Sequence, residues 1–98
     1  MKPTVYHCEA DVELVSAARR YECQSEALGR RFLRAVHVVL ENIREDPERF
    51  AFYDKPARSC LVRGFPYRVI YEVLPDAIYI LAVAHTSLEP GYWKSRFA

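Results

Sequence analysis

The fold is decided by residues 61–93, which read LVRGFPYRVIYEVLPDAIYILAVAHTSLEPGYW. Three runs rich in β-branched and aromatic residues lie in this stretch, a composition typical of β-strands. Gly64-Phe65-Pro66 separates the first two runs, and Leu74-Pro75-Asp76 separates the second from the third. Because glycine and proline mark turns, the pattern predicts an antiparallel meander.

Residues 67–73 alternate between the two faces of the predicted second strand. One face is apolar and carries Tyr67, Val69, Tyr71 and Val73. The other face has a charge at each end and carries Arg68, Ile70 and Glu72. Residues 78–84 hold no polar group except the Tyr79 hydroxyl, so we expect this strand to be covered on both sides and to lie at the centre of the sheet.

Two helices are predicted ahead of the meander, over residues 9–22 and 25–46. The apolar residues of the first lie on one stripe: Ala10, Leu14, Ala17, Ala18 and Tyr21. Those of the second recur at spacings of three and four: Leu28, Phe32, Val36, Val39 and Ile43. Ser25 suits the N-cap of the second helix, and Pro47 ends it because proline disfavours helical geometry in the residue before it. The short gap between the helices predicts an antiparallel hairpin.

A further strand is expected at residues 4–7. It cannot form a tight turn with any later strand, so we expect it beside the central strand and parallel to it. Residues 50–57 are expected to connect the helical hairpin to the meander. Together these elements predict an α+β fold, β-α-α-β-β-β, in which an antiparallel-dominated sheet has the helical hairpin packed on one face. A chain of 98 residues has the size of one domain, so residues 1–98 are expected to form a single domain.

The charges are nearly balanced, with 14 Lys and Arg against 13 Asp and Glu. A short basic strip lies between residues 55 and 71, where there is no anion; its cations are Lys55, Arg58, Arg63 and Arg68. Four cations are few compared with a nucleic-acid-binding tail. We therefore treat the strip as a candidate target-binding surface.

The three cysteines are widely spaced and form no Cys-x-x-Cys pair. Their number and spacing argue against a disulfide framework and a zinc site, and they suit a reducing cytosol. No run approaches the roughly 18 apolar residues that a membrane span requires. The sequence contains no Gly-rich phosphate loop and no cluster of metal ligands, so we expect no cofactor or metal. These features predict a cytoplasmic protein with no membrane partner.

Three side chains are candidates for chemistry. Arg68 can hold a phosphate or carboxylate through its fork of donors, or it can be a solvated arginine paired with Glu72. Tyr92, in the closing loop, can present its hydroxyl to a substrate or can cover an edge of the core. His85 ends the central strand. Histidine is the side chain whose unperturbed pKa lies near neutrality, which suits a general base, but His85 can equally cap loop backbone by hydrogen bonding. A thiol dyad of Cys60 with His85 is conceivable, although a small buried hydrophobe is the commoner role of cysteine.

Several motifs together resemble the RelE/ParE superfamily of bacterial type II toxins. They are FPYRVIY at 65–71, ILAVAH at 80–85, PGYW at 90–93 and, in the helical hairpin, RFL at 31–33. The resemblance spans nearly the whole chain and implies the same β-α-α-β-β-β fold. It also implies a toxin encoded beside a small antitoxin that wraps and neutralises it.

The branch of the superfamily determines which activity is implied. The ending from His85 to Trp93 looks more like ParE, whose members poison DNA gyrase without cutting RNA. RelE-type mRNA interferases act on mRNA in the ribosome with a strand arginine and a late tyrosine, which correspond here to Arg68 and Tyr92. Their other cations are largely missing, since the loop before the second strand offers only Lys55 and Arg58.

The expected function is therefore that of a ParE-like toxin that inhibits DNA gyrase by binding and is neutralised by a cognate antitoxin in a hetero-oligomer. The alternative is a RelE-like mRNA interferase in which Arg68, Tyr92 and His85 are catalytic. A third possibility is a degenerate toxin that only binds its antitoxin, because the closing loop at 86–89 lacks the basic residues that relatives of either branch often carry. Only the interferase is an enzyme, so the sequence leaves enzymatic activity open.

Overall fold

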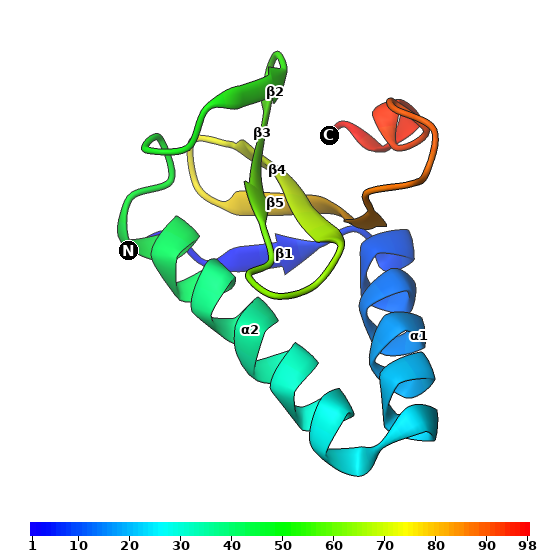
Figure 1. Ribbon diagram of the computed structural model, residues 1–98. Coiled ribbons are helices and arrows are strands. Elements are labelled where there is room, and N and C mark those ends of the chain that lie inside the picture. Colours follow the sequence, from blue (N-terminus) through cyan, green and yellow to red (C-terminus); the bar gives the residue numbers. More distant parts are fainter.

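A computed structural model describes all of residues 1–98, and Figure 1 shows the arrangement of its elements. In chain order they are β1 (Thr4–Tyr6), α1 (Cys8–Gln24), α2 (Glu26–Glu45), β2 (Phe52–Asp54), β3 (Ala57–Leu61), β4 (Tyr67–Val73), β5 (Ile78–His85) and a short 3-10 helix (Lys94–Arg96). The five strands form one sheet in the order β1-β5-β4-β3-β2. The predicted α+β architecture is confirmed, with one additional strand.

The sheet pairing follows the prediction closely. β1 pairs with β5 in parallel. The other three pairs, β5 with β4, β4 with β3 and β3 with β2, are antiparallel. β5 has a hydrogen-bonded neighbour on each side, as its apolar sequence predicts. The additional strand is β2, which lies within the segment expected to be a connection. It has only three residues, all exposed, and its pairing with β3 is irregular, so it has no apolar periodicity that a sequence pattern can reveal.

The two helices are joined at a single residue. Ser25 has extended backbone geometry; its N–H donates to the Tyr21 carbonyl at 3.0 Å, and its Oγ accepts from the Leu28 N–H at 3.4 Å. It therefore ends α1 and begins α2, as predicted for the N-cap. The helices come close together just beyond this joint, where a Cβ added to Gly29 would lie 3.0 Å from the Cβ of Glu22.

The helices begin and end close to the predicted residues. α1 starts one residue earlier than predicted because the His7 side chain acts as its N-cap: Nδ1 accepts from the Glu9 N–H at 3.0 Å. Neither helix is long and apolar enough to cross a membrane.

A first core fills the space between the helical hairpin and one face of the sheet. The predicted helical stripes supply Ala10 and Ala17 from α1 and Phe32, Val36, Val39 and Ile43 from α2, while β4 supplies Val69 and Tyr71. Figure 1 shows both helices on the same side of the sheet. Burial of this apolar surface is the main force that holds the two layers together.

A second, smaller core lies on the other face of the sheet. Its buried residues are Ala57, Ile70, Leu81, Ala82, Ala84 and Trp93. The register between β4 and β5 shifts after Ile70, so that Leu81 and Ala82 are both part of this core. The C-terminal segment (residues 86–98), orange and red in Figure 1, folds back over this face and contributes Trp93, which is 1% exposed. The central strand is thus covered on both sides, as predicted.

Candidate functional site

Arg68 lies half-buried on β4, on the face of the sheet that the C-terminal segment covers. Its Nη1 donates to Ser59 Oγ at 2.9 Å, and its guanidinium carbon lies 4.6 Å from the centre of the Tyr53 ring. The pairing with Glu72 that the strand alternation suggested is wrong. Glu72 is 6% exposed, and its carboxylate accepts from the Ala98 N–H at 2.9 Å because the C-terminal segment covers that end of the strand.

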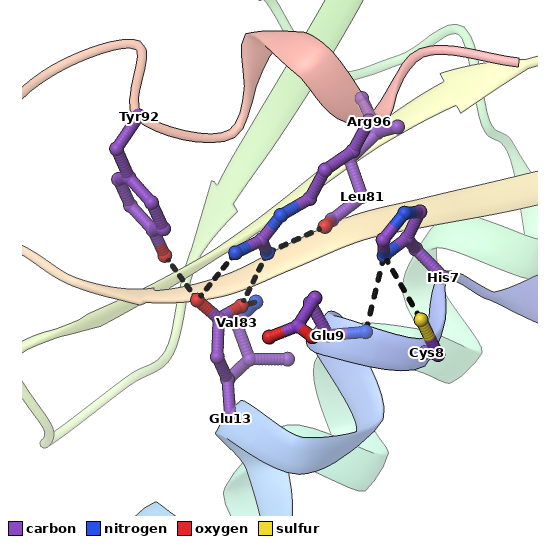
Figure 2. Close-up of polar contacts among 8 residues, drawn as sticks. All are labelled: His7, Cys8, Glu9, Glu13, Leu81, Val83, Tyr92 and Arg96. Carbon is purple, nitrogen blue, oxygen red and sulfur yellow. Dashed lines mark hydrogen bonds and ion pairs between the residues drawn. The ribbon is translucent and has the colours of Figure 1, made fainter.

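Tyr92 is held by a carboxylate from the first helix (Figure 2). Its hydroxyl donates to Glu13 Oε2 at 2.7 Å. The same carboxylate accepts from Arg96, at 2.9 Å to Oε1 and 3.3 Å to Oε2, and from the Val83 N–H at 3.1 Å. Glu13 therefore fastens the C-terminal segment to both α1 and β5. Sequence reasoning missed it, because a single glutamate in an amphipathic helix carries no signal of a contact 79 residues away.

The environment of Tyr92 fixes its protonation state. Burial and the hydrogen bond to Glu13 both raise the pKa of the Tyr92 hydroxyl well above its ordinary value. The hydroxyl is therefore neutral at physiological pH, and its proton is directed at Glu13. In this arrangement it can act neither as a base nor as a free proton donor to a substrate.

His85 makes the loop-capping contacts that were the alternative to a catalytic role. Its Nδ1 accepts from the Ser87 N–H at 3.0 Å and lies 2.7 Å from Ser87 Oγ. Its ring packs edge-on against Tyr67, with the ring centroids 5.1 Å apart. These contacts order the turn that follows β5.

The structure brings Arg68, His85 and Tyr92 together around one cavity of about 40 Å³. Ligand pockets in proteins typically measure about 300–1,000 Å³, so this cavity is far too small to enclose a nucleotide. One polar atom of each side chain is also engaged: Arg68 Nη1 with Ser59, His85 Nδ1 with Ser87, and the Tyr92 hydroxyl with Glu13. The predicted trio is thus adjacent in space but has the contacts of a structural cluster.

The four cations of the basic strip are divided by β3. Lys55 precedes this strand, whereas the exposed Arg63 follows it, at its other end. Arg58 packs over the Phe52 ring at 3.9 Å from its centre, and Lys55 lies over the same ring at 4.9 Å. Arg58 is further fixed by hydrogen bonds to two backbone carbonyls, at 2.8 and 3.1 Å.

These contacts lie along the β2 edge of the sheet, which we call the cation–aromatic edge. It comprises Phe52 and Tyr53 with the cations packed on them, Lys55, Arg58 and Arg68. Phe52 with its cations lies on one face of this edge, and Tyr53 with Arg68 lies on the other. The two rings remain 45% and 42% exposed. Held cations beside exposed rings suit the binding of anionic or aromatic groups of a partner. The sequence indicated the cations but not the two rings that organise them.

The remaining candidates have structural contacts. Cys60 does not meet His85; its thiol donates to the Leu61 carbonyl at 3.7 Å, and burial raises its pKa. No group of three histidine, cysteine, aspartate or glutamate side chains is placed so that it could hold a metal ion.

Comparison with known proteins gives a match along most of the chain. The family model of the ParE toxin of the type II toxin–antitoxin system parDE matches residues 5–90. Among solved structures, the chromosomal ParDE toxin–antitoxin system from P. aeruginosa aligns with a TM-score of 0.65, covering 87% of this chain and 96% of that one. The sequence identity is 16%, so this likeness shows a shared fold. No curated protein sequence matches the chain.

Proposed function

The chain belongs to the ParE toxin family of type II toxin–antitoxin systems, and from this premise we propose that it inhibits DNA gyrase by binding and is neutralised by a cognate antitoxin. Toxin, antitoxin and gyrase would then meet in the cytoplasm. The target-binding surface in this proposal is the cation–aromatic edge, with Arg63 at the far end of β3 as its possible extension.

One observation carries the choice of a binding mechanism. The Tyr92 hydroxyl donates to Glu13, and burial together with this hydrogen bond raises its pKa, while His85 is engaged through Nδ1 with Ser87. An inhibitor that acts by contact needs no free acid or base. It needs an exposed, ordered surface, and the β2 edge supplies one.

The second candidate is an mRNA interferase that acts on the ribosome. The observation in its favour is that Arg68, His85 and Tyr92 line one cavity. Cleavage of an RNA backbone needs a base for the 2′-hydroxyl, an acid for the leaving oxygen and cations for the transition-state phosphate. The Tyr92 hydroxyl would have to leave Glu13 before it could take one of those roles, whereas His85 contacts Ser87 only through Nδ1.

The decisive experiment is induced expression of the chain, with two readouts scored side by side. The supercoiling of plasmid isolated from the induced cells reports gyrase inhibition, and mapping of mRNA 5′ ends reports cleavage. Loss of supercoiling without new mRNA ends is the expected result. New mRNA ends with normal supercoiling would instead assign the interferase. Normal growth with neither effect, together with binding to the antitoxin, would identify a degenerate toxin.

A further inference from the structure

A groove separate from the cavity described above runs along α1, although His85 and Leu88 line both. Its walls are the outer side of α1 and the turn after β5, and it consists of two hollows of about 180 and 400 Å³. Both hollows are lined by Arg20, Tyr67, His85 and Leu88, so they form one continuous groove. The larger hollow lies within the range of about 300–1,000 Å³ typical of ligand pockets.

The helical wall has a simple sequence basis. Val12, Ser16, Arg20 and Gln24 line the groove and follow one another at intervals of four residues. Residues at this spacing lie on the same side of an α-helix. α1 therefore presents one stripe to the first core and a second, mostly polar stripe to the groove.

The middle of the groove, where the two hollows meet, is rich in hydrogen-bond donors. Arg20 donates through Nη2 to the Tyr67 hydroxyl at 2.6 Å, and its guanidinium has no carboxylate partner in the protein. Because the Tyr67 oxygen accepts this bond, the hydroxyl keeps its own proton to donate. His85 accepts at Nδ1 from the Ser87 N–H, so the proton of its neutral ring is on Nε2. An anion placed here would find several donors.

Exposed apolar side chains lie beside these donors. Val12 is 56% exposed and Leu88 is 50% exposed, and Val83 lies between α1 and the turn. The single carboxylate that lines the groove belongs to Glu13, which is already paired with Arg96 and accepts a hydrogen bond from Tyr92. The groove thus combines uncovered apolar side chains with a cation that lacks a counter-ion.

We propose that this groove binds a peptide segment in which an apolar side chain lies next to a carboxylate. The apolar side chain contacts Val12 and Leu88, and the carboxylate accepts hydrogen bonds from Arg20 and Tyr67. This inference rests on the proposed function, since the segment is assigned to the antitoxin that neutralises the chain. Charge complementarity with the unpaired Arg20 selects an acidic segment over a basic or neutral one.

The test uses the full chain and 15-residue peptides that tile the small protein encoded beside its gene. Binding is measured by fluorescence anisotropy with wild type, Arg20→Gln and Arg19→Gln. Arg19 is the matched control, because it is an exposed arginine one residue away that does not line the groove. The Arg20 variant should weaken binding on the order of tenfold or more, whereas the Arg19 variant should leave it nearly unchanged.

Two further arms make the assignment specific. Replacing the carboxylate of the bound peptide by its amide should weaken binding as much as Arg20→Gln does. The two changes together should weaken binding little more than either alone, as expected for directly interacting groups. Leu88 is exposed in a turn, so Leu88→Ser should weaken the apolar contact with the peptide without unfolding the chain. A melting curve of the variant checks that it remains folded.

The failure of this inference is separable from that of the proposed function. If the full antitoxin neutralises the Arg20→Gln and Leu88→Ser variants as well as wild type, the groove is not the docking site, although the toxin assignment stands. Equal losses of peptide affinity in the Arg19 and Arg20 variants would also contradict the assignment of the groove as the docking site. Arg20-dependent binding of a single-stranded oligonucleotide, without binding of any peptide, would show that the groove takes phosphates instead. A chain that neither arrests growth nor binds the antitoxin contradicts the proposed function itself.

Discussion

The hydroxyl of Tyr92 donates to Glu13 Oε2 at 2.7 Å, which joins the C-terminal segment to the first helix (Figure 2). The Glu13 carboxylate also pairs with Arg96, and the two side chains are only 20% and 12% exposed. This cluster holds Trp93 over the second core, because Trp93 lies between Tyr92 and Arg96 in the chain. Tyr92, which corresponds by its position in the sequence to a catalytic tyrosine, thus helps to hold the C-terminal segment against the first helix.

The first prediction concerns this cluster. Glu13→Gln keeps the size of the side chain but leaves the Arg96 guanidinium, which is mostly buried, without its ion-pair partner. We expect the free energy of unfolding to fall by about 2–4 kcal/mol, as when one partner of a buried ion pair is removed. Urea denaturation of wild type and variant measures this change in the free energy of unfolding.

Glu41→Gln is the matched control for this change. Its ion pair with Arg44 has side chains 44% and 38% exposed, so its loss should cost about 0–0.5 kcal/mol. Equal effects of the two substitutions would contradict the role assigned to Glu13.

The second prediction concerns the close approach of the helices. An alanine at position 29 would place its Cβ 3.0 Å from the Glu22 Cβ and 3.1 Å from the Glu22 Cα, so the backbone of α1 would have to shift by a few tenths of an ångström. Overpacking of this kind costs about 1–3 kcal/mol, against the roughly 1 kcal/mol that alanine gains over glycine in a helix. We expect Gly29→Ala to be destabilising or neutral in thermal unfolding.

Ala27→Gly isolates the intrinsic helix preference, because Ala27 is exposed in the first turn of the same helix. It should destabilise by no more than roughly 1 kcal/mol. If Gly29→Ala stabilises the protein by that amount, the helices are not in close contact there.

The third prediction concerns alkaline pH. Burial raises the pKa of Tyr71 to about 12, and burial also raises the pKa of Tyr6, Tyr21 and Tyr92. A tyrosine in the unfolded chain ionises at about pH 10. Below this pH both the folded and the unfolded chain keep the proton, so the stability of the fold is at its full value. Above it the unfolded chain releases protons that the folded chain retains, and stability is lost as pH rises through about 12.

The urea midpoint should therefore fall steeply above about pH 10. Tyrosine ionisation, followed by absorbance, should accompany unfolding rather than precede it. The Tyr71→Phe variant should show a shallower fall, because one of the retained protons is gone. A midpoint that stays constant up to about pH 12 would show that these hydroxyls are not shielded.

The sequence predicts the parts of the fold that depend on periodicity. The apolar stripe of α2, the alternation of residues 67–73 and the apolar run of the central strand each identify an element and the face it buries. The short β2 strand escapes prediction because its three exposed residues have no alternation and are held by pairing with β3 and by packed cations.

The candidate site was less predictable, for a physical reason. Motif positions show that Arg68, His85 and Tyr92 lie near one another, but the roles of these side chains depend on their partners Ser59, Ser87 and Glu13. Such pairings arise between distant segments only after the sheet has formed. The rings that organise the cation–aromatic edge depend on tertiary structure in the same way.

The last prediction separates the two toxin mechanisms through three arginines near β3. If gyrase binds at the cation–aromatic edge, Arg58→Gln and Arg68→Gln should each raise the toxin concentration needed for half-inhibition of supercoiling, by roughly tenfold for a lost charged contact. Arg63→Gln, at the opposite end of β3, should have a smaller effect. An interferase behaves differently: Arg68→Gln alone should then lower mRNA cleavage on the order of 10²-fold or more, because it removes a transition-state charge, while Arg58→Gln leaves the rate nearly unchanged. Mapped cuts in mRNA that disappear only in the Arg68 variant, with fold and antitoxin binding intact, would overturn the binding mechanism.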